Sequence, residues 1–268
     1  MSKKFCVVPW KELYLTSIGT FRMCCQEDEH VDRQTVMNQG IEIHWNSEHM
    51  KQARLDFLNN RAHDACKQCW TDDANGKISL RQRRNQSYLN AQDHELDPWI
   101  DHFKSITDET GHTSSEIQGI NLSVGNTCQL RCTHCSPAYS NNVAKDYAKL
   151  GWDQDYKARK VFFTDQYLGA HKQSTFDADA WPQLKSIAHN FKWIRCTGGE
   201  PTLSRGLLDF MQWLDAEGLA KDIDFGFNTN AVTVKDEWID AAKKFKHTDC
   251  RISVDGSSDI DYYCEISF

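Results

Sequence analysis

From residue 119 onward, short apolar runs alternate with amphipathic segments along the chain. The apolar runs predict strands, and the segments between them, which carry apolar residues at helical spacing, predict helices. Strands that alternate with helices are typical of right-handed βαβ units, so we expect an α/β fold with parallel strands here. The predicted strands are residues 119–124, 192–196, 223–229 and 250–256, and the predicted helices are residues 141–150, 204–218 and 235–245. Residues 151–180 fit the alternation poorly and are interpreted as an insertion in the first crossover.

The first 75 residues show no such alternation. Residues 5–25 predict two short strands on either side of Gly19, where the chain can turn. Residues 46–60 predict a helix that begins after Ser47, because serine is a favoured N-cap and the following apolar residues share one face.

Residues 76–118 read as a helical connector between these two parts. The basic stretch at 77–90 predicts a helix whose Arg81, Arg83 and Arg84 form a solvated face. A second helix is expected to begin after Asp97, which would be its N-cap, with Pro98 at the first helical position. The predicted organisation is a cysteine-rich module at residues 1–75, a connector at 76–118 and an α/β domain at 119–268.

Composition narrows the class of protein. The chain has 268 residues and a formal net charge of −7, which argues against a basic nucleic-acid-binding face. No segment approaches the roughly 20 apolar residues of a membrane span, and the N-terminus does not resemble a signal peptide. We therefore expect a cytoplasmic protein whose partners are neither nucleic acid nor membrane.

The chain contains eleven cysteines, which is a high count for this length. In a reducing compartment they are not expected to form disulfides. Their clustered spacing favours ligation of a metal or a metal cluster instead.

Three of these cysteines, Cys128, Cys132 and Cys135, lie within eight residues directly after the first predicted strand of the α/β domain. Ligands of parallel α/β folds collect at the carboxyl ends of strands. A closed zinc site needs four ligands, and His134 would have to fold back to be the fourth. Iron–sulfur clusters are held by cysteines in short runs of this kind. Three thiolates on a four-iron cluster would leave one iron open to a small molecule.

A second motif follows the next predicted strand, where Gly198, Gly199 and Glu200 form a GGE sequence. Glycines at a strand end let the backbone approach a ligand closely, and a glutamate can pair with an ammonium group. A CxxxCxxC loop and a GGE motif on successive strands resemble the radical S-adenosylmethionine (radical SAM) enzymes. The α/β domain is therefore expected to be a partial (β/α) radical SAM barrel.

This resemblance implies a cofactor and a reaction. Cys128, Cys132 and Cys135 would bind a 4Fe-4S cluster whose open iron takes SAM, and reductive cleavage would give a 5′-deoxyadenosyl radical that abstracts hydrogen from a substrate. A reductant such as a flavodoxin or ferredoxin would supply the electron. The remaining SAM contacts implied by the resemblance are Gly198, Gly199, Glu200, Asn228, Ser253 and Asp255, the last three equally readable as turn residues. Cys196 and Cys250 match no ligand of the family and are interpreted as buried strand residues.

The N-terminal cysteines form a second group. Cys6, Cys24, Cys66 and Cys69 supply four thiols, enough to close an iron–sulfur cluster or a structural zinc site. Their spacing resembles the SPASM/twitch modules of many radical SAM enzymes, which implies one auxiliary 4Fe-4S cluster and two clusters in all. The position of Gly19 favours Cys24 over its neighbour Cys25 as the ligand. Trp10 and Trp70 are expected to shield the site.

Two departures from the family keep the functional alternatives open. The SPASM/twitch-like module precedes the barrel, and only four of six barrel strands are predicted, so we read the chain as a fragment or a partner-dependent form. The leading hypothesis is a radical SAM enzyme that modifies a peptide or protein. The alternatives are a non-catalytic iron–sulfur redox protein derived from that fold and a zinc-stabilised binding module.

Overall fold

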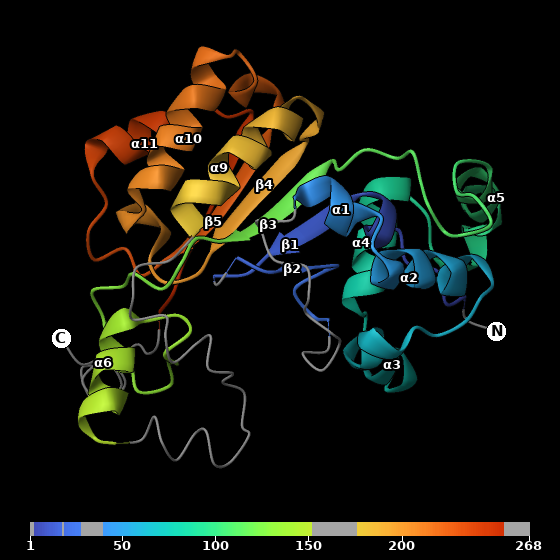
Figure 1. Cartoon of the computed structure of the whole chain (residues 1–268), viewed down its shortest axis with the longest axis horizontal. Helices are drawn as coiled ribbons and strands as arrows, with labels where there is room; N and C mark the ends of the chain where they lie inside the picture. The colour runs from blue at the N-terminus through green and yellow to red at the C-terminus, as the bar shows by residue number, and fades with distance from the viewer. Residues whose placement is uncertain (1–2, 18, 28–39, 152–175, 255–268) are drawn as a thin grey trace. The chain divides into compact units, whose positions relative to one another are not determined.

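The computed structural model describes residues 3–17, 19–27, 40–151 and 176–254, with the side chains of 176–179 left out (Figure 1). The fold is mixed α/β, with one six-stranded sheet in the order β2-β1-β3-β4-β5-β6. The chain divides into two compact units, one comprising residues 1–14 and 21–120 and the other residues 15–20 and 121–268. Among the described helices, none has both the length and the apolar character needed to cross a membrane.

Unit 1 combines two short strands with several helices. Strands β1 and β2 flank Gly19, which has a positive φ of 75°, as the turn prediction requires. Ser47 caps α2 by accepting a hydrogen bond from the backbone N of Met50, as predicted. The bounds are β1 Glu12–Leu15, β2 Phe21–Arg22, α1 Ile41–Trp45, α2 Glu48–Leu58, α3 Lys67–Ala74, α4 Leu80–Leu89 and α5 Asp97–Ser105.

The core of unit 1 contains aromatic rings and a buried cation. Phe5, Trp10 and Phe103 pack together with ring centroids 5.0–5.6 Å apart. Arg54 of α2 is fully buried and donates to the carbonyl oxygens of Pro9 and Trp45 at 2.9 and 2.6 Å. Burial removes water from the guanidinium and lowers the pKa of Arg54 to about 9. The two carbonyl oxygens take the place of the lost water as hydrogen-bond acceptors.

Two predictions in the connector are wrong. Arg81 of α4 is buried rather than solvated, because Asp73 and Asp93 neutralise it. Helix α5 begins at Asp97 itself and Leu96 takes the N-cap position, so the predicted cap is displaced by one residue. Asp97 still lies in the first turn, where a carboxylate favours the positive end of the helix dipole.

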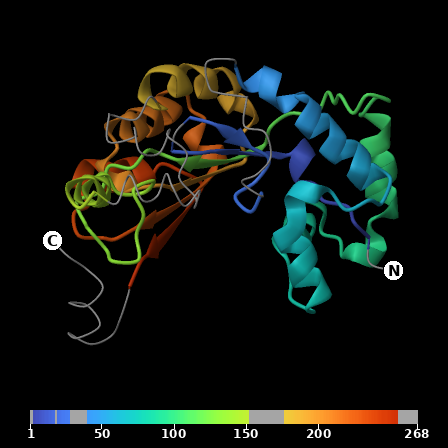
Figure 2. The same cartoon turned by 60° about the horizontal axis from the view of Figure 1, so that its bottom comes forward.

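Unit 2 contains the predicted alternation of strands and helices. The β4–β5 and β5–β6 pairs are parallel, and Trp193, Asp224 and His247 lie side by side at their start. Figures 1 and 2 show α9, α10 and α11 on the same face of these strands. The bounds are β3 Gly119–Ser123, α6 Asn141–Lys149, α9 Phe176–Ile187, β4 Trp193–Thr197, α10 Arg205–Ala216, β5 Asp224–Thr229, α11 Asp236–Ala242 and β6 His247–Ile252. The first of these strands begins within unit 1, at Gly119 and Ile120.

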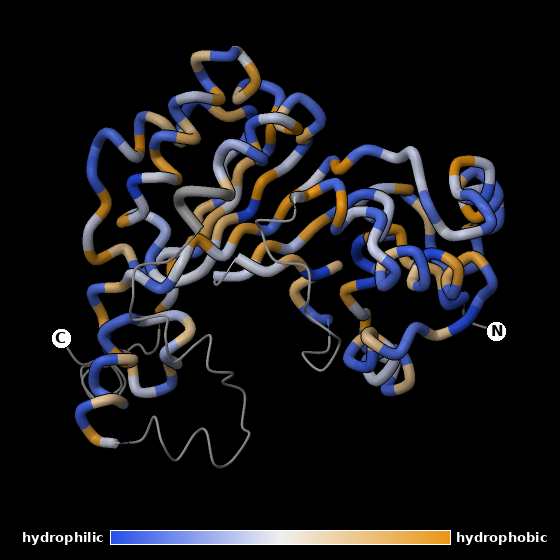
Figure 3. Tube along the Cα trace, in the orientation of Figure 1, coloured by the Kyte–Doolittle hydropathy of each residue, from blue (hydrophilic) through white to orange (hydrophobic). Residues whose placement is uncertain are grey.

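The core of unit 2 forms between β5 and the helices that cover it. Phe227 of β5 meets Trp238 of α11 edge to face at 4.4 Å, and Phe225 stacks on Phe245 at 4.6 Å. Figure 3 shows hydrophobic residues following the strands of the sheet. The alternation of Phe225 and Phe227 along β5 places both rings on the face that α11 covers.

The last described strand, β6, differs from its prediction. It spans His247–Ile252 rather than 250–256, because its pairing with β5 starts at Asp224 and extends through the polar residues before Cys250. All of its residues are exposed, so the interpretation of Cys250 as buried is wrong, whereas Cys196 of β4 is fully buried as expected. Of the predicted insertion at 151–180, residues 152–175 lie outside the described residues.

Candidate functional site

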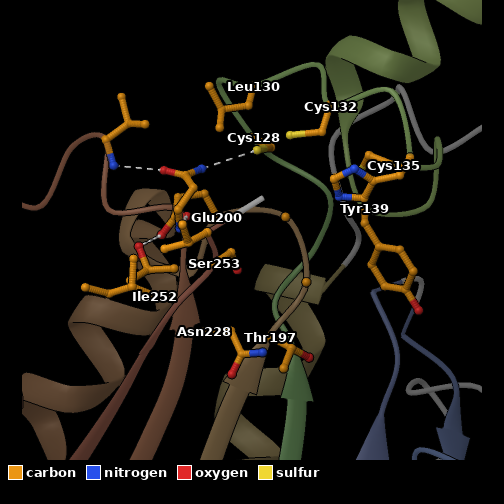
Figure 4. Close-up of a pocket in the computed structure, with 17 residues that line it drawn as sticks. Cys128, Leu130, Cys132, Cys135, Tyr139, Thr197, Glu200, Asn228, Ile252 and Ser253 are labelled. Carbon is orange, nitrogen blue, oxygen red and sulfur yellow. Dashed lines mark hydrogen bonds between the residues drawn. The ribbon is translucent and has the colours of Figure 1, made fainter. Parts of the chain in front are cut away.

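A pocket of about 400 Å³ opens at the carboxyl ends of the unit 2 strands (Figure 4). The loop after β3 contributes three thiols, the turn after β4 contributes the GGE motif, and β5 and β6 contribute their last residues. The structure therefore brings nearly all the predicted site residues of this domain to one place. The predicted residues that line the pocket are Cys128, Cys132, Cys135, Gly198, Gly199, Glu200, Asn228 and Ser253.

The cysteine loop is attached to the end of β4 by main-chain hydrogen bonds. The backbone N of Gly199 donates to the carbonyl oxygen of Gly125 at 2.9 Å, and that of Glu200 donates to Thr127 O at 2.8 Å. The backbone N of Val124 donates in the other direction, to Thr197 O at 2.9 Å. These three bonds continue the sheet beyond its strands and hold the start of the loop against the turn after β4.

Glycine is required at both positions of this turn. A Cβ on Gly199 would lie 2.3 Å from Thr127 O, and one on Gly198 would lie 2.8 Å from Gly125 O. Gly198 also has a φ of +121°, which L-residues rarely adopt. The glycines thus permit close approach of the cysteine loop's own backbone, a role that the sequence interpretation, directed at a ligand, did not include.

Glu200 is buried, and its carboxylate is already surrounded by donors. Oε1 accepts hydrogen bonds from the hydroxyl groups of Thr202 and Thr229, each at 2.7 Å. The backbone N of Thr202 also donates to Oε1 at 3.2 Å, and that of Asn230 donates to Oε2 at 2.8 Å. Glu200 therefore connects the turn after β4 to the end of β5, and Oε2, which accepts only one of these four bonds, keeps a lone-pair site for an ammonium group.

The three thiols of the loop are partly accessible. Burial raises the pKa of Cys135 to about 11, and the nearby thiols of Cys132 and Cys128 add to the effect. Burial also raises the pKa of Cys128, and the charge of Glu200 adds to this shift, whereas hydrogen bonds from the backbone of Leu130 and, to a smaller degree, from the Asn230 side chain oppose it. Crowded thiols with raised pKa values disfavour three bare thiolates, and a bound cation or cluster would reverse that preference.

The other predicted SAM contacts occupy different strand ends. Asn228 lies on β5, one residue before its end, and is exposed at the pocket. Ser253 directly follows β6, and its backbone N donates to Thr229 O at 2.8 Å. Asp255 lies outside the described residues.

Unit 1 contains the second group of thiols. All four predicted ligands, Cys6, Cys24, Cys66 and Cys69, line one small cavity of about 20 Å³, whereas Cys25 is not among its described lining residues. Burial raises the pKa of Cys6 to about 12, and it raises the pKa of Cys66 well above its usual range, where the thiols of Cys6 and Cys69 contribute. The shared lining of one small cavity places these four cysteines near one another.

The residues that line this cavity are mostly apolar, and the exception is the buried cation Arg81. Trp70 lines the cavity, as expected of a shielding residue, whereas Trp10 lies in the aromatic core and donates to Thr107 Oγ1 at 2.8 Å. Arg81 also lines it and donates to Asp73 and Asp93 at 2.7–3.1 Å. Sequence reasoning missed this arginine because its partners lie eight and twelve residues away on other elements.

Both donor sets fit iron–sulfur clusters by their chemistry. Unit 2 offers three half-buried thiols at an open pocket, and unit 1 offers four thiols around an enclosed cavity. Cysteine thiolates are the ligands that such clusters prefer. Over the described ranges, no three histidine, cysteine or acidic side chains are arranged to hold a single metal ion.

Comparison with known proteins supports the interpretation of the N-terminal module. Residues 6–70, which contain all four thiols of the unit 1 cavity, match the family model SPASM, described as an iron-sulfur cluster-binding domain. This match confirms the predicted resemblance of the N-terminal module to a SPASM-type module. No curated protein matches the chain.

Two solved structures of Streptococcus suis SuiB are similar to this chain, one bound to S-adenosylmethionine and one bound to the precursor peptide SuiA. Sequence identity is 14% and 15%, and the TM-score is 0.33 in both cases. The match covers 82% of this chain but only 43% and 44% of SuiB, so the chain spans less than half the length of those structures.

Proposed function

We propose that this chain is a radical SAM protein with a SAM-cleaving 4Fe-4S cluster in unit 2 and one auxiliary 4Fe-4S cluster in unit 1. The observation that carries the proposal is the unit 2 pocket, which is lined by both the three cysteines of the CxxxCxxC loop and the GGE motif. The N-terminal SPASM match supports the auxiliary cluster.

Each residue group of the unit 2 pocket would have a distinct part. Cys128, Cys132 and Cys135 would hold the cluster, which when bound supplies the electron for SAM cleavage. Gly198 and Gly199 have no Cβ, so the backbone of the cysteine loop can lie directly against this turn and bond to it. Asn228 and Ser253, at the ends of β5 and β6, would present polar groups to the rest of SAM.

Glu200 would have a structural part in addition to the predicted contact with the ammonium group of SAM. Three donors hold Oε1 and one holds Oε2, so we expect the carboxylate to connect the ends of β4 and β5. An ammonium group of SAM would join this network as a further donor. Each carboxylate oxygen has about two lone-pair sites, and Oε2 accepts only the bond from the backbone N of Asn230, so the ammonium group would bind at Oε2.

The substrate we propose is a peptide or protein. The basis for this proposal is the SPASM-type module. SuiB, to which the chain is similar, has been solved with a precursor peptide bound. A flavodoxin- or ferredoxin-like reductant would supply electrons, and the cytoplasm would supply the reducing conditions that free cysteines need.

A second candidate function is a non-catalytic iron–sulfur redox protein. The exposed β6 favours it, because Ile252 and Val254 line the pocket and are 59% and 76% exposed in the part of the chain that the structure describes. Radical chemistry needs an enclosed substrate. In that case SAM would bind weakly or not be cleaved.

The test is a comparison of anaerobically purified wild-type protein with the Cys128→Ser/Cys132→Ser/Cys135→Ser triple variant. The wild-type protein should contain about eight iron and eight sulfide per chain, and the variant about four. SAM should change the EPR signal that the variant lacks and leave the remaining signal unaltered.

The possible outcomes separate the hypotheses. Release of 5′-deoxyadenosine under reduction supports the enzyme, and SAM binding without cleavage supports a partner-dependent form. A fully loaded cluster with no spectral response to SAM would favour the redox protein. Equal iron content in the wild-type protein and the triple variant would contradict a cluster on the unit 2 loop, and zinc in place of iron would favour the binding module.

A further inference from the structure

Asn230 occupies the turn that follows β5, next to the predicted cluster ligands. Its backbone N donates to Glu200 Oε2 at 2.8 Å, which fixes the start of the turn. The next residue, Ala231, has a positive φ of 56° and donates from its backbone N to Thr229 Oγ1 at 3.0 Å. The main chain is therefore held on both sides of the Asn230 side chain.

The orientation of the Asn230 amide follows from its partners. Its Oδ1 accepts a hydrogen bond from the backbone N of Val232 at 3.0 Å and another from Gln129 Nε2 at 3.0 Å. A backbone N–H is always a donor, so the atom facing Val232 must be the oxygen. The Nδ2 group must then face the other way, where it lies 3.8 Å from Cys128 Sγ and 3.4 Å from Gln129 Oε1.

We propose that Asn230 is a positioning residue that donates an N–H···S hydrogen bond to the Cys128 thiolate and thereby raises the reduction potential of the unit 2 cluster. This inference rests on the proposed function, in which Cys128 ligates that cluster. Hydrogen bonds to ligand sulfurs are among the features that set cluster potentials. The reduced cluster carries one more negative charge than the oxidised cluster, so a donor at the sulfur stabilises the reduced form more.

The chain offers a matched comparison in Asn142, on the helix that follows the cysteine loop. Its Nδ2 donates to the main-chain oxygens of Cys128 and Gln129, at 3.0 and 3.4 Å. Asn142 therefore contacts the same two residues as Asn230 but donates to carbonyl groups instead of a sulfur. An asparagine-to-aspartate change at either position adds one carboxylate near the loop, and only the change at 230 removes the donor to sulfur.

The experiment is an EPR-monitored redox titration of anaerobic wild-type protein, Asn230→Asp and Asn142→Asp. The signal to follow is the one absent from the Cys128→Ser/Cys132→Ser/Cys135→Ser variant. At a fixed ambient potential, Asn230→Asp should lower the ratio of reduced to oxidised cluster at least tenfold, a shift of about 59 mV for one electron. Asn142→Asp should lower it by less than threefold. Equal shifts in the two variants would overturn the proposal, because charge alone would then account for them.

A second measurement tests the contact in the wild-type protein itself and uses the two variants as controls. Protein labelled with ¹⁵N in the asparagine side chains should show a weak nitrogen coupling to the reduced unit 2 cluster in pulsed EPR. The coupling should persist in Asn142→Asp and should be lost in any loaded Asn230→Asp cluster. Its absence from both the wild-type protein and Asn142→Asp would overturn the role of Asn230. If the triple cysteine variant keeps all its iron and signals, the proposed function itself fails.

Discussion

The two cysteine sites of this molecule differ in how they meet solvent. In unit 1, four thiols line a cavity of about 20 Å³ whose lining is mostly apolar. In unit 2, three half-buried thiols line a pocket of about 400 Å³ that also contains polar strand ends. A four-thiol enclosed site suits a cluster that only stores or passes electrons, whereas a three-thiol open site leaves a position for a small molecule. The number of thiols and the size of the space therefore indicate the same division of roles.

The two sites also differ in what holds them in place. Unit 1 uses side chains: Arg81 reaches across the wall of the cavity to Asp73, Asp93 and the carbonyl oxygen of Phe5. Unit 2 uses the main chain, through the bonds from Gly199 and Glu200 to the cysteine loop. The first site should therefore be sensitive to loss of a charged group, and the second to any atom added between two backbones.

The largest expected effect distinguishes the two neighbouring thiols of unit 1. Cys24→Ser should remove the auxiliary cluster and about four of the eight iron atoms, because Cys24 lines the cavity. Cys25→Ser, the matched control, should keep the full iron content, because Cys25 is exposed. Iron analysis and EPR of the two anaerobic variants provide the check. Loss of the auxiliary signal in Cys25→Ser alone would reverse the ligand assignment.

Arg81→Met should destabilise unit 1 by about 3–5 kcal/mol, the cost of leaving buried carboxylates without their partner. The side chains of Arg81 and Asp73 are only 1% and 8% exposed, so solvent does little to screen the loss. Arg83→Met on the same helix removes an exposed cation and should change stability by less than about 0.5 kcal/mol. Anaerobic urea unfolding measures both. Similar small changes in the two variants would show that the ion pairs do not hold this site.

Gly199→Ala should destabilise unit 2 by about 2–3 kcal/mol, because the added Cβ would lie 2.3 Å from a carbonyl oxygen of the cysteine loop. Gly218→Ala is the control: Gly218 has a φ of +72° but open space around it, so the cost should be only about 1 kcal/mol. Urea unfolding and the iron content of both variants provide the measurement. A cost for Gly199→Ala no greater than that of the control would mean that the loop moves away freely.

The smallest effect concerns Ala231, which has a φ of +56° in the turn beside Asn230. Ala231→Gly should stabilise the protein by about 0.5 kcal/mol, because relief of the left-handed conformation slightly exceeds the added entropy of the unfolded chain. Ala216→Gly, at the end of α10, should lower stability instead. Thermal unfolding of the two variants would reveal opposite signs. A loss of stability in both would show that the turn is not strained.

The sequence predicted the strands of unit 2 well, because β4 and β5 are rich in apolar residues and bounded by turns. It misplaced β6, because His247 and Asp249 are polar and their strand conformation depends on pairing with β5. It also placed the cysteine and GGE residues at strand ends, where the structure brings them to one pocket.

Two functional features had no sequence signal. The ion pairs of Arg81 join residues on separate elements, so a basic stretch reads as solvated until its acidic partners are located. Asn230 reads as an ordinary turn residue, because nothing in its neighbours along the chain reveals that its amide faces Cys128. Both depend on contacts between distant segments, which periodicity does not encode.

The main-chain attachment of the cysteine loop has a consequence for how this family of sequences would vary. Thr127 and Gly199 lie on opposite sides of the same contact, yet only one of them is constrained in identity. Thr127 contributes its carbonyl oxygen, which every amino acid possesses, and its side chain is exposed. Gly199 contributes the absence of a side chain, which no other residue can supply. Deep mutational scanning would therefore find that position 127 tolerates many amino acids and that position 199 tolerates only glycine. An alignment would show a conserved glycine motif, although the contact that requires it involves both backbones.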